Sequence, residues 1–458
     1  MNIKLKKLLG FAVLVSPLFA QAKEKHPNVV VIYIDDMGIG DIGCYGGRFV
    51  PTPNIDKLAE DGLIFNQYYS AAPVSSPSRS ALTTGRFPLT LGINTFLEKK
   101  HANKRCEQRN YLDDSFPSMA RAFQNAGYVT CHIGKWHMGG GRDVMDAPSI
   151  LNYGFDEYIS TYESPDPDPA ITSTDWIWSK SDSIKRWRRT EYFVDKSIDF
   201  IKRNKDNSFF LNLWPDDMHT PWIPESFEDS KPSWATEVAF KPVLKELDLQ
   251  IGRFIAALDE LGLSNNTIVI FTSDNGPSPS FEQMRSARLR GTKNSLYEGG
   301  IRMPFIIKYP KEIEAGIVND KTVLCSVDLY PSLCAIAGIN REKGYRGDGE
   351  DMSKALLGKK EIVRKTDLMW DFGRNKFFGS PKDKNNRSPH LAIRRGKWKL
   401  LVNSDGSKMQ LYNMEVDKYE INNVVKEHIA LANEMKAKVC SWYVENRQNN
   451  LIYINKEN

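Results

Sequence analysis

Cysteine is scarce in this sequence, and its spacing matches none of the usual cysteine-based sites. The six cysteines lie far apart and include no Cys-x-x-Cys pair, which excludes a zinc-finger type of site and a small fold held together by disulfides. In an oxidising compartment some of them could pair, but the spacing selects no connectivity. Burial as small apolar side chains is an equally good interpretation.

The chain also has little net charge and, after residue 20, no apolar run long enough to span a bilayer. A basic start, the apolar residues 8–20 and the small-x-small site Ala20-Gln-Ala22 predict a secretory signal peptide over residues 1–22. Its removal takes three of the 62 basic residues and none of the 57 acidic ones, so the net charge falls from +5 to +2. This balance argues against nucleic-acid or membrane-surface binding. We therefore expect a periplasmic or secreted protein without a membrane span.

The residues that are present suffice for a large core. Hydrophobic residues make up 41% of the 458 residues and charged residues 26%, which excludes a disordered or collagen-like chain. Runs rich in β-branched residues alternate with helical segments such as 115–126 and 242–261. The predicted strands are residues 28–34, 128–133, 208–213, 267–272 and 303–309. This alternation predicts an α/β fold with a large, mainly parallel sheet flanked by helices.

The pattern changes near residue 345. Short strand-like runs followed by a helical segment predict a small C-terminal antiparallel sheet with a helix. The predicted strands are residues 366–370, 390–393 and 398–402, and the predicted helix is 425–445. We therefore expect a large N-terminal domain over 23–345 and a C-terminal subdomain over 346–458. Residues 161–189, dense in Pro, Asp, Ser, Trp and Arg, predict a long loop of the kind that often carries function.

Polar residues follow four of the predicted strands. In a parallel sheet the carboxyl ends of the strands form one edge, where ligands bind. The segments at these ends are Asp35-Asp36, Lys135-Trp-His137, Asp216-Asp-Met-His219 and Ser273-Asp-Asn-Gly276. Each segment alone is equally well explained as a turn or a helix cap. The four together predict a common site.

Two groups of side chains define the chemistry of this site. The oxygen donors are Asp35, Asp36, Asp274 and Asn275. A set of oxygen atoms that includes three carboxylates favours Ca²⁺ or Mg²⁺ over a zinc site. The hydrogen-bond donors and proton-transfer groups are Lys135, His137, His219 and Lys293. The combination indicates an anionic ligand held between a metal ion and cationic side chains.

The most specific pattern is the stretch Ser75-Ser-Pro-Ser-Arg-Ser-Ala-Leu-Thr-Thr-Gly-Arg86. Pro77 suits the first turn of a helix, so Ser75 should lie at the N-terminus of that helix, where backbone amides favour an anion. Arg79 would project toward the same anion one turn later. An ordinary serine-capped helix is the simpler interpretation of these residues taken alone.

This stretch matches, at every specified position, the signature of the type I sulfatases, Cys/Ser-x-Pro-Ser-Arg-x-x-x-x-Thr-Gly-Arg, and the chain resembles that family. Further blocks that fit the family are Asp35-Asp36 and residues 127–137, 273–276, 291–302, 392–399 and 411–414. The resemblance therefore covers nearly the whole chain after the signal peptide. It implies an alkaline phosphatase-like fold, a catalytic N-terminal domain and activity as a sulfuric ester hydrolase.

The resemblance also implies a nucleophile and a metal site. Ser75 corresponds to the residue that is oxidised after synthesis to formylglycine, whose hydrate is the nucleophile in this family. A sulfated serine would be a stable ester, whereas a sulfated geminal diol can expel sulfate when its second hydroxyl group loses a proton. The residues that correspond to the ligands of one Ca²⁺ ion are Asp35, Asp36, Ser75, Asp274 and Asn275.

The remaining catalytic roles follow from the same resemblance. His137 corresponds to the residue that takes the proton from the hydrate. Arg79, Lys135 and Lys293 correspond to the groups that hold the sulfate. His219 corresponds to the histidine near the ester oxygen and, with Lys293, is the candidate for protonating the leaving group.

Serine rather than cysteine at position 75 resembles the members that anaerobic, radical-SAM-type maturases modify, because the oxygen-dependent maturase acts on cysteine. The resemblance therefore implies an anaerobic bacterial source and such a maturase as a partner. A cysteine-to-serine replacement made to obtain an inactive form is the alternative.

Bacterial relatives often act on sulfated glycans, and the chain offers side chains for such a substrate. Aromatic rings can stack on sugars, and arginines can bind neighbouring carboxylates or sulfates. The candidates are Glu98, Lys99, Lys100 and His101, then Trp176, Trp178, Trp187 and residues 185–189, then Arg285, Arg288 and Arg290. A solvated loop is the alternative for each group. We expect an exo-acting sulfatase that removes O-sulfate from a terminal hexose or N-acetylhexosamine.

Two other functions fit parts of the pattern. A phosphate-ester hydrolase of the same superfamily would share the sheet and the anion site, but it usually needs a pair of zinc or manganese ions with more histidine ligands. A non-catalytic glycan-binding homologue that is never matured would keep the fold. The presence of every catalytic candidate argues against this second alternative.

Overall fold

The computed structural model describes residues 26–171, 181–227, 236–373 and 381–457. The predicted signal peptide over 1–22 and the candidate residues Trp176 and Trp178 lie outside the described residues. Among the helices in the described part of the chain, none is both long enough and apolar enough to cross a membrane.

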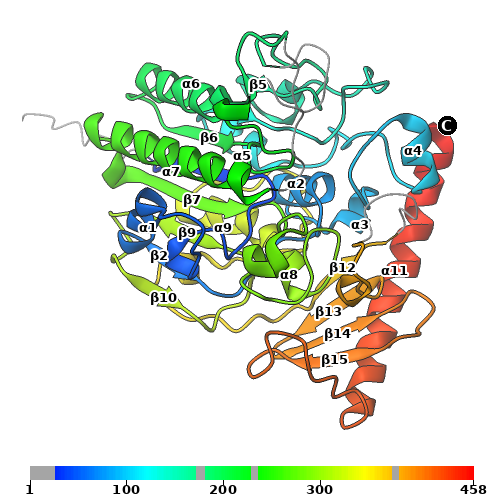
Figure 1. Ribbon diagram of the computed structural model, residues 1–458. Helices are drawn as coiled ribbons and strands as arrows, with labels where there is room; N and C mark the ends of the chain where they lie inside the picture. The colour runs from blue at the N-terminus through cyan, green and yellow to red at the C-terminus, as the bar shows by residue number, and fades with distance from the viewer. Residues whose placement is uncertain (1–25, 172–180, 228–235, 374–380, 458) are drawn as a thin grey trace, which may run out of the picture.

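A large mixed sheet forms the centre of the molecule (Figure 1). Its strands lie in the order β10-β2-β9-β7-β1-β6-β4-β5, and those from β7 to β5 are all parallel. β9 is antiparallel to both of its neighbours. The strands are β1 (Asn28–Ile34), β2 (Leu63–Phe65), β4 (Val129–Gly134), β5 (Glu157–Ser160), β6 (Phe209–Trp214), β7 (Thr267–Ser273), β9 (Phe305–Lys308) and β10 (Ile317–Asn319). The predicted large, mainly parallel sheet is confirmed.

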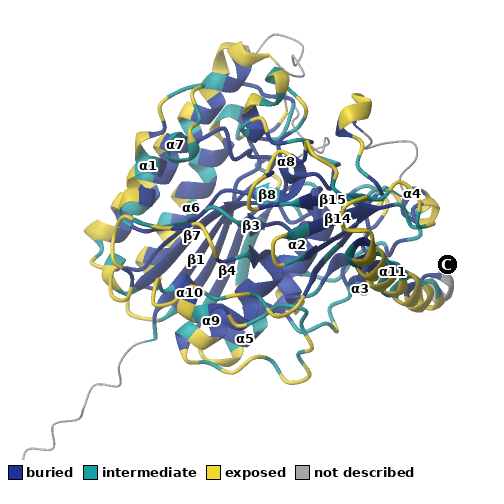
Figure 2. Ribbon diagram, turned by 90° about the horizontal axis from the view of Figure 1, so that it is seen from below, coloured by how far each residue is buried: buried dark blue, intermediate teal, exposed yellow. Residues whose placement is uncertain are grey.

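Helices cover both faces of this sheet (Figure 2). One face is covered by α1 (Pro53–Glu60), α6 (Arg189–Arg203) and α7 (Glu237–Glu260), the other by α2 (Ser75–Thr84), α5 (Met119–Asn125) and α9 (Leu329–Ala337). Alternate side chains of β1 point to opposite faces. Val29, Val31 and Tyr33 join one core cluster, whereas Val30, Ile32 and Ile34 join the other. A strand buried on both faces explains the continuous β-branched run in the sequence.

A second, smaller sheet and several short helices complete the fold. A three-stranded sheet is formed by β11 (Leu324–Cys325), β3 (Tyr68–Tyr69) and β8 (Arg302–Met303). Short helices are α3 (Pro88–Leu91), α4 (Lys100–Arg105), α8 (Glu298–Ile301) and α10 (Ser353–Leu356). Four of the six cysteines, Cys106, Cys131, Cys325 and Cys334, are buried, in agreement with the interpretation as small apolar side chains.

The C-terminal part contains the predicted small antiparallel sheet and helix (Figure 1). The strands are β12 (Leu368–Asp371), β13 (Leu391–Arg395), β14 (Trp398–Val402) and β15 (Gln410–Asn413), in that order across the sheet. The helix α11 (Ile429–Glu457) packs on β13 and β14 through Ala432, Met435 and Val439. The domain boundary between residues 345 and 346 stays a prediction.

Some predicted boundaries are wrong, each for a local reason. The helix predicted from residue 242 begins at Glu237, because the Thr236 side chain caps it. The helix predicted from residue 115 begins at Met119, where Ser118 is the cap. The strand predicted over residues 303–309 is divided at Pro304 into β8 and β9. Proline has no amide hydrogen to donate to a neighbouring strand.

A buried ion cluster joins the small sheet to α8. Lys399 Nζ lies 2.8 Å from Glu298 Oε1 and 2.9 Å from Glu420 Oε1, and all three side chains are fully buried. Burial opposes ionisation of Glu298, but Lys399 and Arg302 hold its pKa at about 2. Burial raises the pKa of Glu420 to about 7 against the attraction of Lys399. The positive charge of Lys399 therefore offsets the repulsion between the two buried carboxyl groups.

Replacing Lys399 with methionine is expected to lower the free energy of unfolding by about 3–5 kcal/mol, because it removes the cation that Glu420 and Glu298 share and leaves Glu298 paired with Arg302. Urea unfolding would measure the loss. Lys397→Met is the matched control: Lys397 is 45% exposed and lies 3.9 Å from Glu415, a surface pair worth at most about 1 kcal/mol. Equal losses for the two variants would contradict a structural role for the cluster.

Candidate active site

The polar segments that follow four parallel strands meet at one edge of the sheet. Asp35 and Asp36 follow β1, Asp274 and Asn275 follow β7, Lys135 and His137 follow β4, and His219 lies beyond β6. Backbone bonds tie these ends together, since the Asp35 amide donates to Pro215 O and the Lys135 amide donates to Trp214 O. The predicted site is therefore assembled from parts of the chain that are far apart in the sequence.

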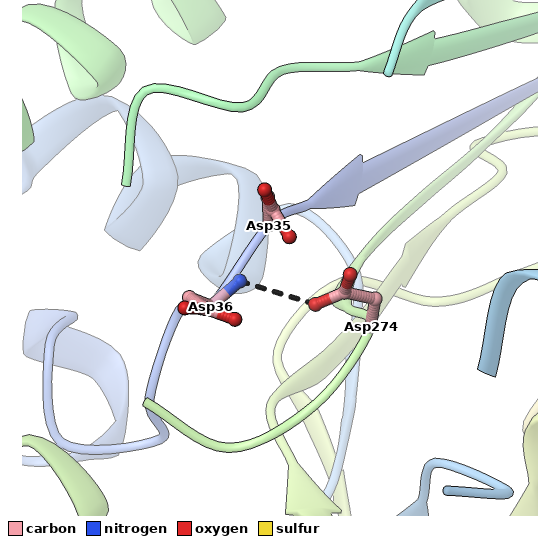
Figure 3. A group of neighbouring side chains, drawn as sticks. All are labelled: Asp35, Asp36 and Asp274. Atoms are coloured by element: carbon pink, nitrogen blue, oxygen red, sulfur yellow. Dashed lines mark hydrogen bonds between the residues drawn. The ribbon is translucent and has the colours of Figure 1, made fainter. Parts of the chain in front are cut away.

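Three carboxyl groups gather at the centre of this edge. Asp35, Asp36 and Asp274 each place an oxygen atom within 4.8 Å of the others, and all three are fully buried (Figure 3). The Asp36 amide donates to Asp274 Oδ1 at 3.1 Å, in a left-handed turn with φ 56° at Asp36. Asn275 Nδ2 donates to Asp36 Oδ1 at 2.7 Å. Burial, with the neighbouring carboxylate charges, raises the pKa of Asp274 to about 7 although Arg79 opposes the shift.

Each carboxyl group has a cationic partner. The Nζ atoms of Lys135 and Lys293 lie 2.8 Å from Asp35 Oδ2 and Asp36 Oδ2. The Arg79 guanidinium lies 2.8 Å from Asp274 Oδ2 and 3.3 Å from Asp35 Oδ1. Three carboxyl groups therefore face three cationic side chains, and a divalent cation would add further positive charge to the site. Clustered carboxylate and amide oxygens without sulfur ligands fit a hard cation such as Ca²⁺.

Ser75 begins α2 beside this cluster. Its Oγ donates to Asp35 Oδ1 at 3.0 Å and lies 3.4 Å from Asn275 Oδ1, and the residue is 1% exposed. Val74 before it is extended and caps the helix, so Ser75 lies at the N-terminus of α2, as predicted. Arg79, one turn later, points to the same cluster. The helix N-terminus and the carboxylate cluster form one site.

Both candidate histidines lie at the edge of the cluster. His137 stands in a left-handed turn with φ 52°, and its Nε2 lies 3.2 Å from Leu97 O. His219 Nε2 lies 3.7 Å from Asp36 Oδ2. Burial, with Lys293 nearby, lowers the pKa of His219 to about 4, and burial with Lys135 nearby holds the pKa of His137 well below its usual value. Neutral rings, able to accept a proton, are favoured at neutral pH.

The sequence did not single out Glu163 and Arg142, which lie beside His137. Glu163 Oε2 is 3.6 Å from His137 Nδ1, and Glu163 Oε1 is 3.5 Å from Arg142. Glu163 falls within the predicted functional loop 161–189, the only sequence signal that could have indicated it. Nothing in the sequence indicated Arg142.

Several predicted substrate contacts are wrong, because the arginines have buried partners. Arg285 is fully buried, lies 2.8 Å from Asp41 and packs on Trp222. Arg186 and Arg189 both pair with Asp216, at 2.6 and 2.9 Å. These pairs stabilise loops near the site instead of binding a ligand.

Other predicted substrate residues remain at the surface. Lys99, just before α4, and His101, within α4, are exposed, whereas Lys100 pairs with Asp146 at 2.8 Å. Arg288 and Arg290 line a cavity of about 860 Å³ between the N-terminal and C-terminal parts. Thr292, which precedes Lys293, also lines this cavity.

Comparison with known proteins agrees with this geometry. Residues 27–339 match the family model described as Sulfatase, and residues 292–445 match the model described as N-sulphoglucosamine sulphohydrolase, C-terminal. The chain belongs to the sulfatase family. This sulfatase is 28% identical to the N-acetylgalactosamine-6-O-sulfatase of Bacteroides thetaiotaomicron, over 89% of this chain and 91% of that protein. It is 31% identical to human N-acetylgalactosamine-6-sulfatase, over 74% of this chain and 67% of the human protein.

Solved structures show the same fold. The sulfatase matches a structure from work on the metabolism of glycosaminoglycans by Bacteroides thetaiotaomicron with a TM-score of 0.75 and 26% identity, covering 92% of this chain and 100% of that one. The structure of Ps i-CgsB in complex with k-i-k-neocarrahexaose matches with a TM-score of 0.74 and 26% identity. The match covers 92% of this chain and 94% of that one. The family and the fold identify the sulfatase as a sulfuric ester hydrolase with an alkaline phosphatase-like architecture.

Proposed function

We propose that this sulfatase removes O-sulfate from a terminal hexose or N-acetylhexosamine of a sulfated glycan, with one Ca²⁺ ion and a formylglycine at position 75. The observation that carries the proposal is the position of Ser75 at a helix N-terminus, 3.0 Å from a carboxylate of the buried cluster. The catalytic domain would be residues 23–345 and the C-terminal subdomain residues 346–458.

The metal ligands would be Asp35, Asp36, Asp274, Asn275 and residue 75. Bound there, Ca²⁺ would supply positive charge next to the nucleophile and the sulfate oxygens. The hydrate of formylglycine would supply two hydroxyl groups, one to attack sulfur and one to lose a proton when sulfate leaves.

The cationic side chains would hold the sulfate group. Arg79, Lys135 and Lys293 already surround the cluster and are anchored by its carboxylates. Arg79 and Lys135 are buried, and ion pairs hold all three side chains, so their charge would be available without reorganisation during the reaction. His137 would take the proton from residue 75, and His219 with Lys293 would protonate the leaving oxygen.

A carbohydrate substrate is supported by the relatives, which include N-acetylgalactosamine-6-sulfatases and a complex with k-i-k-neocarrahexaose. The cavity of about 860 Å³ beside Thr292 is large enough for a sugar unit. Tyr419 and Arg288 in its wall offer an aromatic ring and a positive charge for that unit.

The serine at position 75 supports maturation by an anaerobic, radical-SAM-type enzyme in an anaerobic bacterium. The segment 1–22 supports export to the periplasm or out of the cell. A preparation from a host without such a maturase is expected to fold but to turn over little substrate.

A joint measurement tests the proposal: mass spectrometry of the peptide that contains residue 75, and a panel of defined sulfated monosaccharides. Formylglycine at position 75 should coincide with release of sulfate from a hexose or N-acetylhexosamine. Full activity with unmodified Ser75 would disprove the mechanism, and activity confined to internal positions of long chains would disprove exo action. Faster cleavage of matched phosphate esters would favour the phosphohydrolase alternative. Tight glycan binding without desulfation, after confirmed oxidation, would favour the binding-protein alternative.

A further inference from the structure

Glu163 and His137 are held together by the backbone. The His137 amide donates to Glu163 O at 3.0 Å, so the turn after β4 is fixed against the segment that carries Glu163. A glycine run follows His137 and packs on the same segment. A Cβ atom on Gly140 would meet Ser164 C at 2.1 Å, and one on Gly141 would meet Tyr162 O at 2.5 Å. The two side chains therefore have a defined separation.

The ring nitrogens of His137 have different surroundings. Nε2 lies 3.2 Å from Leu97 O, and a carbonyl oxygen can only accept, so Nε2 carries the hydrogen. Nδ1 is buried, has no hydrogen-bond partner and lies 3.6 Å from Glu163 Oε2. In the neutral ring Nδ1 is therefore the nitrogen that can take a proton, and the nearest acidic group to it is Glu163.

We infer that Glu163 is a positioning residue for His137: its carboxylate holds the ring and stabilises the positive charge that forms when Nδ1 takes a proton. The inference rests on the proposed function, in which His137 is the base. The proton passes from a hydroxyl oxygen of hydrated residue 75 to Nδ1. The electron pair left on that oxygen forms the carbonyl group as the bond between carbon and the sulfate oxygen breaks. Glu163 itself takes no proton in this step.

The charges around the pair show why a carboxylate is needed there. Lys135, Arg142 and Arg79 all disfavour a proton on His137. Asp35 favours it, while Asp35 and Asp216 both repel a charge on Glu163. The two carboxylate oxygens of Glu163 have different partners: Oε1 faces Arg142 and Oε2 faces His137. Burial raises the pKa of Glu163, and Lys135 and Arg142 oppose that shift, so Arg142 favours the ionised carboxylate next to the base.

The test uses full-length protein with the formylglycine content of every variant measured by mass spectrometry. Glu163→Gln keeps the shape of the side chain and removes its charge. It is expected to lower kcat about 10- to 100-fold and to change KM less than about twofold. Losses of this size are typical when a group that orients a reactive residue is removed. An unchanged kcat in a folded variant would overturn the inference.

A double-mutant cycle separates action through His137 from a structural effect. In a His137→Ala background, Glu163→Gln is expected to lower kcat less than about twofold further, because its target is missing. A loss as large as in the wild type would overturn the inference. If His137→Ala itself leaves kcat unchanged, the proposed role of His137 fails, whereas a loss with His137→Ala and none with Glu163→Gln rejects only the role of Glu163.

Glu98→Gln is the matched control, because Glu98 Oε1 lies 3.7 Å from the same Arg142 but belongs to a candidate substrate loop. Its effect is expected mainly on KM. A kcat loss equal to that of Glu163→Gln would mean that the effect comes from unpairing Arg142, which would overturn the inference.

A measurement that does not depend on catalytic activity completes the test. Nitrogen chemical shifts of the His137 ring in the unoxidised Ser75 protein are expected to show a hydrogen on Nε2 and none on Nδ1 at neutral pH. His137→Ala assigns the signals, and Nε2 without a hydrogen would overturn the inference even if Glu163→Gln fails to fold.

Discussion

Replacing Ser75 with alanine is expected to lower kcat for sulfate-ester hydrolysis at least about 10⁴-fold, because the variant can form neither the aldehyde nor its hydrate. The change removes one buried oxygen atom whose hydrogen bond goes to Asp35. The fold should survive, since α2 keeps its backbone bonds and the neighbouring side chains. Steady-state kinetics on a sulfated monosaccharide, with the melting temperature measured in parallel, would check both parts.

Ser80→Ala is the matched control for this experiment. Ser80 is buried on the same helix, and its hydroxyl donates to Ser76 O within the helix. Ser80 stands at a position where the sulfatase signature allows any residue, and its hydroxyl hydrogen bond goes to the helix backbone and not to the carboxylate cluster. Its kcat should stay within about threefold of the wild type, as expected for loss of one local hydrogen bond. Comparable losses for Ser75→Ala and Ser80→Ala would show that α2, not the residue 75 hydroxyl, limits activity.

Removing calcium, or replacing Asp274 with asparagine, should produce the second large effect. Chelation is expected to lower the activity of the wild type strongly and to lower its melting temperature, since an ion at 100 times its Kd stabilises the folded state by about 2.7 kcal/mol. In Asp274→Asn the cluster loses one of three carboxylates, and fully buried Arg79 loses the charged partner whose Oδ2 accepts two of its hydrogen bonds. We expect activity to fall at least about 10³-fold and the free energy of unfolding to fall by about 3–5 kcal/mol.

The calcium dependence separates these two effects of Asp274→Asn. The wild type should be stabilised by added Ca²⁺, whereas the variant should show little or no shift in melting temperature. Asp41→Asn is the control, because Asp41 forms an equally buried pair with Arg285, 2.8 Å away and outside the cluster. This control should lose stability but keep its response to Ca²⁺. A full calcium response in Asp274→Asn would disprove the assignment of Asp274 as a ligand.

Local patterns were sufficient to predict the centre of the fold. Both faces of β1 are buried, so its sequence is uniformly apolar and reveals a parallel strand without knowledge of its neighbours. The residues directly after β1, β4 and β7 could be assigned to one site because parallel strands bring their carboxyl ends together. The signature from Ser75 to Arg86 added the identity of the nucleophile by resemblance.

Contacts between distant segments were the part that the sequence could not reveal. Arg285 stands in a basic stretch that looked suited to an anionic substrate, but Asp41, distant in the sequence, pairs with it inside the core. Glu163 has no motif around it, and its relation to His137 arises from a close approach of two turns. Such pairs depend on tertiary packing, which neither periodicity nor capping residues encode.

The two hydrogen-bond partners of Ser75 appear at very different times during synthesis. Asp35 precedes Ser75 by 40 residues, whereas Asn275 follows it by 200. At ribosomal speeds of 5–20 residues per second, about 10 to 40 s pass between the synthesis of Ser75 and that of Asn275. Ser75 is 1% exposed once folded, so the proposed maturase would have to act on the nascent or not yet folded chain. The proposed oxidation would therefore compete with folding, and variants that fold faster would be expected to carry less formylglycine.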